Sequence, residues 1–382
     1  VPMSGNTSLA GGTFAEGSIV LSLERLNKIR EIRSTSRIAI VEAGVVLSNL
    51  HQAVDEYDLI FPMTFGARGS AMIGGMLSTN AGGSNVLKYG NTRDLCLGLE
   101  VVLPNGEIME IMSELHKDNS GYNLKHLMIG AEGTLGIITA AVLKLSPKPK
   151  AEATAMLATS SLDEALHVLN RLQSATGGSV QAFEYMPGDY IDAFCARFPE
   201  RNAPFNVRYD TNIMVDLGST VGAMCAADKT GKTKLTEFLE QVLSEEYDRG
   251  AVLDAVVAQN EAQRQEMWDR RECAAEVTIT RRPIVANDIA VPLDRLNMFI
   301  TEMEKKLQSI DPGGKSVNVA HLGDGNIHYT VWPASEDIEV HANIVEEVEE
   351  LVLSLGGSFS AEHGIGLSKL PSMERRKNPV AM

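Results

Sequence analysis

Residues 64–83 read TFGARGSAMIGGMLSTNAGG, and small residues occupy most of these positions. Small side chains let a backbone approach a ligand closely and turn its N–H groups toward an anion. Two further segments share this composition: VPMSGNTSLAGG at residues 1–12 and GAEGTLGIIT at residues 130–139. Any one of these loops could serve only tight turns. Three of them within the first 139 residues predict a site for a large, phosphate-bearing ligand.

The common nucleotide-binding signatures are missing from these loops. Neither Gly-x-Gly-x-x-Gly after a strand nor a phosphate loop ending in Gly-Lys-Ser/Thr occurs in them, so the Rossmann and P-loop folds are disfavoured. Short apolar runs at 38–41, 100–103 and 137–145 alternate with glycines, and Pro147 and Pro149 follow the last run. Residues 1–147 are therefore predicted to form a strand-rich domain that ends in a proline-marked linker.

The rest of the chain, residues 148–382, mixes helical and strand patterns. Ser161 and Glu164 form a capping box ahead of an apolar helical repeat that stops at Gly177. Strands are predicted at 180–185 and 212–217, and helices at 235–243 and 344–355. This pattern predicts a second domain of the α+β class that binds the substrate.

Charge and cysteine content exclude several classes of protein. With 50 acidic and 34 basic residues among 382, the net charge is −16, which disfavours nucleic acid as a partner. The cysteines are scattered without a Cys-x-x-Cys pair, so no iron–sulfur cluster is expected on this chain. No apolar run is long enough to predict a transmembrane segment. A cytoplasmic protein is expected, or one of the mitochondrial matrix if the source is eukaryotic; a homodimer is one expected assembly.

The glycine-rich loops resemble those of the vanillyl-alcohol oxidase and p-cresol methylhydroxylase superfamily, in its D-lactate, glycolate and D-2-hydroxyglutarate dehydrogenase branch. The resemblance covers nearly the whole chain. It implies an FAD-binding domain of the p-cresol methylhydroxylase type, followed by a cap domain with an antiparallel sheet and flanking helices. It also implies that the cofactor is contacted by one set of residues: Gly5, Asn6, Thr7, Thr79, Asn80, Gly83, Gly136, Ile138, Thr139 and Asn326.

Several positions depart from this family's pattern. Met3 and Ser4 stand where the branch usually has glutamine and glycine, and Ser8 stands where it has glycine. Asn6 occupies the region in which other superfamily members often carry a histidine that tethers FAD covalently, so non-covalent FAD is expected. Because the chain begins at Val1, and full-length relatives open with a βαβ part, we expect the N-terminal part of the flavin domain to be missing.

The most specific local motif is HLGDGNIH at residues 321–328, between two alternating segments. If Asp324 and Gly325 are the centre of a type I′ turn, His321 faces His328 across a hairpin, with Cβ atoms about 4.5–5.5 Å apart. Two imidazoles at that spacing can share one metal ion, and Glu362 in SAEHGIG is a candidate third ligand. The resemblance implies the same three ligands. An open two-histidine, one-carboxylate site suits catalytic zinc or manganese.

The expected chemistry is oxidation of a small D-2-hydroxy acid, with hydride transfer to FAD and an unknown electron acceptor. A metal lowers the pKa of the substrate hydroxyl, and His363 is the candidate base. Within MWDRRE, the resemblance implies that Arg271 binds the substrate carboxylate, for which a guanidinium is well shaped. An Arg-Arg pair on a charged helix could also be only surface.

The substrate's size is read from two further positions. Ala275 and Ala286 stand where hydroxyglutarate-specific members have a threonine and a lysine. Unless Arg281 or Arg282 replaces them, a five-carbon diacid is less favoured than a D-lactate-like monoacid; D-2-hydroxyglutarate and glycolate are the alternative substrates. Two alternatives remain: a flavin-dependent alkyl-glycerone-phosphate-type synthase, disfavoured because such proteins carry a run of histidines where Glu362 and His363 stand, and a catalytically silent flavin- or metal-binding protein.

Overall fold

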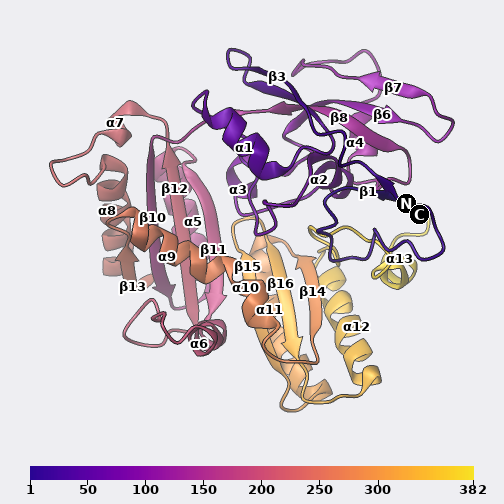
Figure 1. Cartoon of the computed structure of the whole chain (residues 1–382). Coiled ribbons are helices and arrows are strands. Elements are labelled where there is room, and N and C mark those ends of the chain that lie inside the picture. Colours follow the sequence, from indigo (N-terminus) through magenta and orange to yellow (C-terminus); the bar gives the residue numbers. More distant parts are fainter. The chain divides into compact units, whose positions relative to one another are not determined.

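The computed structural model describes residues 1–382, which divide into two compact units. The first unit contains Val1–Lys148 together with the C-terminal segment Glu362–Met382. The second unit contains Pro149–Ala361. Figure 1 shows the elements of each unit along the chain. None of the helices is both long and apolar enough to span a lipid bilayer.

The first unit is built around a five-stranded antiparallel sheet with the strand order β3-β4-β8-β6-β7. Two small two-stranded sheets, β1-β2 and β5-β9, accompany it. The strands are β1 (Pro2–Met3), β2 (Leu21–Ser22), β3 (Ile29–Arg33), β4 (Ile38–Glu42), β5 (Leu59–Ile60), β6 (Cys96–Val102), β7 (Ile108–Ile111), β8 (Ile137–Lys144) and β9 (Ser146–Pro147). The helices are α1 (Leu47–Asp55), α2 (Ile73–Thr79), α3 (Val86–Tyr89), α4 (Lys125–Met128) and α13 (Leu370–Arg376).

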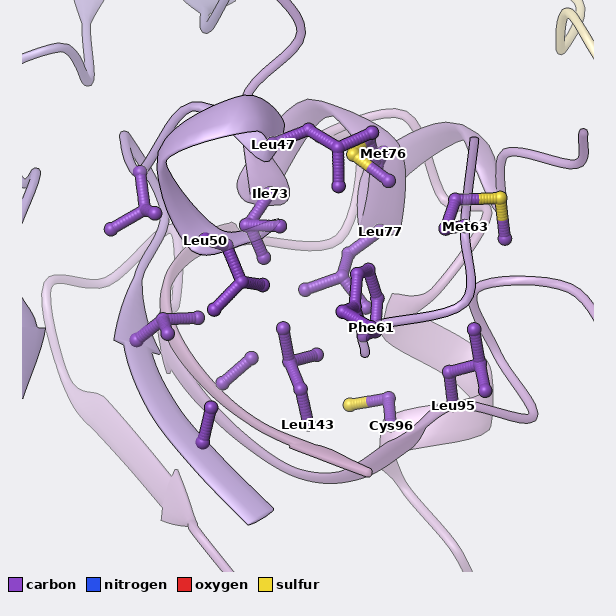
Figure 2. Packing of buried hydrophobic residues seen from close by; sticks show 14 of the residues in the cluster. Leu47, Leu50, Phe61, Met63, Ile73, Met76, Leu77, Leu95, Cys96 and Leu143 are labelled. Atoms are coloured by element: carbon purple, nitrogen blue, oxygen red, sulfur yellow. The ribbon is translucent and has the colours of Figure 1, made fainter. Parts of the chain in front are cut away.

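The core of the first unit lies between this sheet and helices α1 and α2. Figure 2 shows the side chains of Leu50, Phe61, Leu77 and Leu143 converging from helix, loop and sheet. The apolar runs at 38–41, 100–103 and 137–145 are confirmed as strand-forming: they overlap β4, β6 and β8, with only Leu103 and Leu145 outside the strands, and β8 lies between β4 and β6 in the sheet. Side chains on both faces of β8 are buried in apolar clusters. An unbroken apolar run is typical of such a central strand.

The second unit contains a seven-stranded antiparallel sheet with the order β13-β10-β12-β11-β15-β16-β14. Its strands are β10 (Ala151–Thr159), β11 (Val180–Pro187), β12 (Thr211–Ser219), β13 (Val252–Val257), β14 (Val285–Ala290), β15 (Lys315–His321) and β16 (Asn326–Trp332). Its helices are α5 (Leu162–Thr176), α6 (Gly188–Arg197), α7 (Gly222–Cys225), α8 (Lys234–Arg249), α9 (Glu261–Glu272), α10 (Ala274–Thr278), the short 3₁₀ helix η1 (Leu293–Arg295), α11 (Leu296–Ile310) and α12 (Ile338–Ser354).

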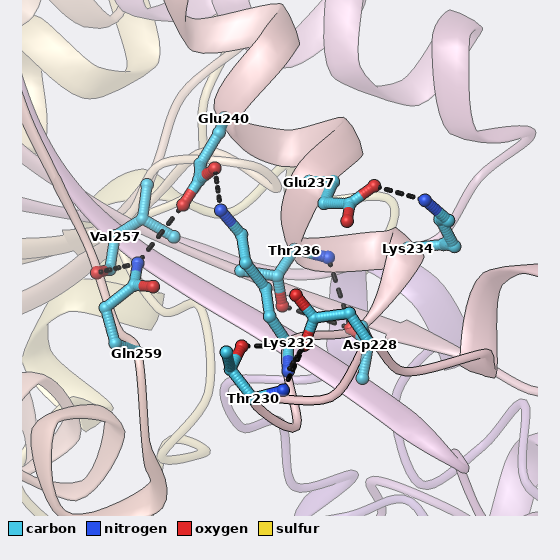
Figure 3. Close-up of polar contacts among 10 residues, drawn as sticks. Asp228, Thr230, Lys232, Lys234, Thr236, Glu237, Glu240, Val257 and Gln259 are labelled. Atoms are coloured by element: carbon cyan, nitrogen blue, oxygen red, sulfur yellow. Dashed lines mark hydrogen bonds and ion pairs between the residues drawn. The ribbon is translucent and has the colours of Figure 1, made fainter.

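Local capping signals place several of these helices. The Ser161 hydroxyl accepts a hydrogen bond from the backbone N–H of Glu164, and the left-handed residue Gly177 ends α5, as its sequence pattern predicts. Thr233 caps α8 in the same way, after a turn in which Asp228 accepts hydrogen bonds from two residues (Figure 3). The predicted helices at 235–243 and 344–355 are confirmed as parts of α8 and α12, the latter ending at Ser354.

The two faces of the seven-stranded sheet are covered by different helices. Helices α6, α9 and α10 pack on one face through an apolar cluster that includes Tyr190, Trp268 and Val319. Helix α11 packs on the other face, where Phe299 meets Tyr329 with ring centroids 5.5 Å apart. Because side chains alternate along a strand, His328 points away from α11, toward the face of α9. The predicted α+β class with antiparallel sheets is confirmed.

We expect Leu143→Ala to destabilise the protein by about 2–5 kcal/mol, because it leaves a cavity in a core that excludes water. Leu143 is fully buried in the cluster between the sheet and helices α1 and α2. Leu115→Ala is the matched control, since that side chain is 65% exposed. Thermal or urea unfolding of both variants measures the difference. Equal midpoints for the two variants would contradict this account of the core.

Candidate active site

The predicted hairpin is present, but the predicted register is wrong. His321 pairs with Asn326, and His328 pairs with Val319. The connection has four residues, Leu322 to Gly325, and the carbonyl oxygen of His321 accepts hydrogen bonds from Asp324 (3.2 Å) and Gly325 (3.1 Å). A type I′ turn needs positive φ at both central residues. Only Gly325 has it (φ 85°), so the tight turn does not form.

His321 and His328 nevertheless lie on one face of the sheet. Asn326 and His328 are two residues apart on β16, so both point to the side on which His321 lies. The two imidazole rings are 5.3 Å apart and nearly perpendicular. Each ring offers a nitrogen within 4.8 Å of the other. A single zinc ion would need both nitrogens at about 2.0–2.1 Å.

Each histidine contacts a carboxylate through the same ring nitrogen. The Nδ1 atom of His321 lies 2.9 Å from Oε1 of Glu184, and Nδ1 of His328 lies 3.4 Å from Oδ1 of Asp288. A carboxylate accepts hydrogen bonds, so it favours the tautomer with the proton on Nδ1 and the lone pair on Nε2. The pair thus has the donor orientation that metal-binding histidines usually show.

Glu184 also holds Arg271, which helix α9 presents to the same face. The Arg271 Nε atom donates to Oε2 of Glu184 at 2.8 Å, and its Nη2 atom lies 3.3 Å from Nε2 of His321. Both side chains are buried. Burial alone would raise the pKa of Glu184, but electrostatic interactions and hydrogen bonds with His321 and Arg271 hold that pKa below its ordinary value.

Asn326 contributes a buried acceptor beside the histidines. Its amide nitrogen donates to Oδ1 of Asp288 at 2.9 Å and to the carbonyl of Ile289 at 3.0 Å. Its Oδ1 atom is buried and has no hydrogen-bond partner. Buried polar atoms are nearly always satisfied, so an orphaned acceptor here points to a bound molecule that donates to it.

The first glycine-rich loop approaches the second closely in the first unit. A Cβ atom at Gly5 would collide with the Ser70 carbonyl oxygen, so only glycine fits there. Asn6 follows with a left-handed backbone (φ 50°), and the backbone N–H groups of Asn6 and Thr7 donate no hydrogen bond within the chain. Exposed N–H groups in such a turn can bind an anion.

The predicted FAD residues of the second loop lie around the end of α2. Thr79 is the last residue of the helix, and its hydroxyl donates to the carbonyl of Gly75. Asn80 caps the helix in the left-handed conformation, and its side-chain oxygen accepts from the N–H of Arg93 at 3.0 Å. Gly83 is buried against Thr64. The side chains of Thr79 and Asn80 therefore order the loop itself.

The predicted residues of the third loop lead into β8. Gly136 lies against Val101 of β6, and the Thr139 hydroxyl donates to the Glu100 carboxylate at 2.7 Å. Ile138 is buried in the core of the first unit, with only 3% of the residue exposed. Any contact of Ile138 with a cofactor would therefore involve its backbone groups.

The segment that carries Glu362 and His363 is fixed within the first unit by Glu132. The Glu132 carboxylate accepts the backbone N–H groups of Ile365 and Gly366, both at 2.8 Å. A Cβ atom at Gly366 would collide with the carbonyl oxygen of Ala10, and the φ of Gly366 is 50°. The first loop, the third loop and the C-terminal segment are therefore packed together.

A hydrogen bond connects the residue just before Glu362 to strand β14 of the second unit. The preceding residue, Ala361, donates its N–H to the carbonyl of Asp288 at 3.1 Å. Asp288 is the strand residue whose carboxylate contacts His328. Glu362 and His363 are thus one and two residues along the chain from a hydrogen bond to the strand beside the histidine pair.

The positions considered for a distal substrate charge lie at the edge of this face. Ala275 is on α10, and Ala286 on β14 pairs with Thr330. The Arg281 guanidinium lies over the ring of Trp332, 4.9 Å from its centroid. Arg282 is exposed in the loop that leads to β14.

Two carboxylates that hold candidate site residues in place were not identified from the sequence. Glu184 is a single carboxylate inside the apolar run VQAFEYMP at 180–187, and an isolated charge in a buried strand is a usable signal because it requires a partner. Glu132 lies in the third glycine-rich loop, but its partners are more than 230 residues away, and no local pattern identifies them.

Comparison with protein families gives two matches that together span most of the chain. Residues 1–112 match the FAD binding domain family, and residues 148–382 match the family of FAD linked oxidases, C-terminal domain.

Curated relatives match over almost the full length of this chain. The mitochondrial D-2-hydroxyglutarate dehydrogenase of Danio rerio is 36% identical over 96% of the chain, which covers 67% of that protein. The D-2-hydroxyglutarate dehydrogenase of Xanthomonas citri pv. viticola is 35% identical over 97% of the chain, which covers 76% of that protein. A D-2-hydroxyglutarate–pyruvate transhydrogenase of Saccharomyces cerevisiae is 33% identical over 100% of the chain and 76% of its own length.

A solved structure of alkyldihydroxyacetonephosphate synthase superimposes with a TM-score of 0.68 at 18% identity. The match covers 94% of this chain and 68% of that one, and at this identity it shows the fold alone. The predicted architecture, an FAD-binding domain of the p-cresol methylhydroxylase type with an antiparallel cap domain, is confirmed by these matches.

We expect Glu132→Ala to loosen the segment at residues 363–366, because the two backbone N–H groups lose their shared acceptor. Hydrogen–deuterium exchange should show faster exchange at Ile365 and Gly366, with β8 unchanged. Glu107→Ala is the control, since Glu107 lies in a surface turn where its carboxylate bonds Asn105. Unchanged exchange at residues 365 and 366 in the Glu132 variant would contradict the role of this carboxylate.

Proposed function

Because the chain belongs to the FAD-linked oxidases and is an FAD-dependent dehydrogenase acting on a CH–OH group, we propose that it oxidises a small D-2-hydroxy acid to the 2-oxo acid. The observation that carries this proposal is the histidine pair His321 and His328, held by a carboxylate at each Nδ1 and flanked by Arg271. In the proposed division of labour, residues 1–147 bind FAD and residues 148–382 bind metal and substrate.

FAD is proposed to bind without a covalent bond, because Asn6 rather than histidine stands in the first loop. The unbonded N–H groups of Asn6 and Thr7 suit its phosphates, and the tight approach at Gly5 keeps the loop in that shape. Gly83, Gly136 and Ile138 would present backbone rather than side chains. Asn326 offers its orphaned buried Oδ1 as an acceptor to the bound cofactor or substrate.

The proposed metal ligands are Nε2 of His321, Nε2 of His328 and the carboxylate of Glu362. The donor set of two imidazoles and one carboxylate fits zinc or manganese and leaves coordination positions open. The support comes from the spacing of the histidine nitrogens, the carboxylates at Nδ1, and the short chain connection from Ala361 to Glu362.

When bound, a metal held by His321, His328 and Glu362 would polarise the substrate hydroxyl, and FAD held by the loops of residues 1–147 would accept the hydride from C2. Arg271 binds the substrate carboxylate through its Nη atoms, since Glu184 already engages its Nε. His363 takes the hydroxyl proton. Asp288 on β14 keeps His328 in place through its carboxylate, and Asn326 donates to the same carboxylate oxygen.

For the substrate, we propose a D-lactate-like monoacid. Ala275 and Ala286 offer no charge to a second carboxylate, and Arg281 is stacked on Trp332. D-2-hydroxyglutarate is the competing candidate, favoured by the names of the relatives from Danio rerio and Xanthomonas citri pv. viticola.

The metal proposal predicts that chelation abolishes turnover of D-hydroxy acids while FAD stays bound, since different residues hold the two. His328→Ala should act like the chelator. His363→Ala should keep the metal and lower kcat by about 10²–10⁴-fold, the usual loss of a general base. Metal analysis, flavin absorbance and steady-state kinetics separate these outcomes. A His328→Ala protein with full metal content and activity would falsify the metal proposal.

The substrate proposal predicts faster anaerobic flavin bleaching with D-lactate than with D-2-hydroxyglutarate at equal concentrations. The L-enantiomers serve as controls for stereochemistry. A preference for D-2-hydroxyglutarate would overturn the monoacid assignment and leave the dehydrogenase activity standing. If the preference for D-2-hydroxyglutarate disappears in Arg281→Ala, Arg281 binds the distal carboxylate of that substrate. No bleaching with any 2-hydroxy acid would contradict the proposed activity itself.

A further inference from the structure

We propose that Glu184 is a positioning residue that makes His321 a metal ligand and aims Arg271 at the substrate. This inference rests on the proposed function, because it concerns how the same metal site is built. Glu184 lies in the middle of β11, directly opposite His321 on β15. Only 1% of it is exposed, between the apolar residues Phe183 and Tyr185. An unpaired carboxylate at such a position would be strongly destabilising.

Both oxygens of Glu184 are committed to functional side chains. Oε1 accepts from Nδ1 of His321 at 2.9 Å, and Oε2 accepts from Nε of Arg271 at 2.8 Å. Because a carboxylate only accepts, Nδ1 must carry the hydrogen, and in the neutral ring that binds a metal the lone pair of His321 is then on Nε2. One carboxylate therefore selects the tautomer of the histidine and the orientation of the arginine.

The bond to Glu184 also determines which nitrogens of the Arg271 guanidinium remain available to a substrate carboxylate. With Nε bonded to Glu184, the Nη edge of the guanidinium is directed toward Nε2 of His321, with Nη2 at 3.3 Å. A substrate carboxylate bound to the Nη atoms would then lie beside the atom proposed to hold the metal. The distance from the metal ligand to the carboxylate-binding group is thus set by a residue that touches neither metal nor substrate.

Asp216 provides a matched comparison within the same unit. It is a buried carboxylate on β12 that pairs with Arg264 of α9, with Nη2 and Oδ2 3.4 Å apart. Arg264 lies seven residues before Arg271, so both arginines leave the helix on the same side. Asp216 bonds Thr154 and Gln181 rather than a histidine. It therefore shares the structural role of Glu184 and lacks the positioning role.

The test uses Glu184→Gln, which keeps the size of the side chain. A glutamine has one accepting and one donating end, whereas both neighbours in the proposed state are donors. If its oxygen faces Arg271, its NH₂ group faces His321 and forces the proton onto Nε2. If its oxygen faces His321, its NH₂ group opposes the Nε–H of Arg271. The variant cannot satisfy both partners.

We expect Glu184→Gln to weaken Zn²⁺ binding about 10–100-fold, the usual effect of losing a carboxylate behind a metal-binding histidine. Competition with a chromophoric chelator on the FAD-loaded protein measures the affinity. FAD content should stay at the wild-type level, and KM for the hydroxy acid should rise. Asp216→Asn should lower the unfolding temperature and leave Zn²⁺ affinity unchanged.

The outcomes distinguish the two proposals. Wild-type affinity in Glu184→Gln, or equal loss of affinity in Glu184→Gln and Asp216→Asn, overturns the positioning role and leaves the metal site intact. If wild type and His328→Ala bind Zn²⁺ equally, the metal site of the proposed function fails, and this inference fails with it.

Discussion

The buried carboxylate of Glu184 is the constraint on which the candidate site depends. Bonding His321 and Arg271 at 2.9 and 2.8 Å, it joins strand β11, strand β15 and helix α9 in one polar cluster inside an apolar core. Such a cluster is stable only when every member is satisfied, because an unpaired charge in the interior costs several kcal/mol, roughly 3–5 when one partner is removed. The geometry proposed for the site and the requirement for folding therefore coincide at Glu184.

A second carboxylate, Glu132, has the corresponding role in the first unit. It binds two backbone N–H groups of the segment that follows Glu362 and His363. The glycine at 366 is required because the chain passes so close to Ala10 that a side chain would not fit. The glycine-rich loops therefore fix the segment that begins with Glu362 and His363, the residues proposed as third metal ligand and base. The glycine-rich loops and the segment that carries Glu362 and His363 form one packed structure rather than independent parts.

Local patterns in the sequence predicted the helices and strands well, but they predicted contacts between residues far apart in the chain poorly. The strands at 38–41 and 137–145 and the capped helix after Ser161 follow from periodicity and caps, which depend on neighbours in the chain. The predicted hairpin register was wrong because Asp324 does not adopt a positive φ. The φ of that residue depends on the conformation of the whole loop. His321 and His328 nevertheless lie close together, as predicted. Because side chains alternate along a strand, His321 lies on the same face as His328 whether it pairs with Asn326 or with His328. Glu184 and Glu132 have partners 87 to 234 residues away, so only the fold brings them into view.

The proposed choice of substrate rests on the supply of positive charge on the face that carries Arg271. Burying a carboxylate without a cation or hydrogen bonds is costly. Arg271 can serve one carboxylate, and the positions at 275 and 286 are alanines. A second carboxylate would have to draw Arg281 away from the Trp332 ring, at the loss of a cation–π interaction worth about 0.5–1 kcal/mol at an exposed site. That loss is small compared with a buried, charge-assisted hydrogen bond, which contributes about 1.5–3 kcal/mol. A diacid therefore becomes the better substrate only if the guanidinium of Arg281 can reach its distal carboxylate.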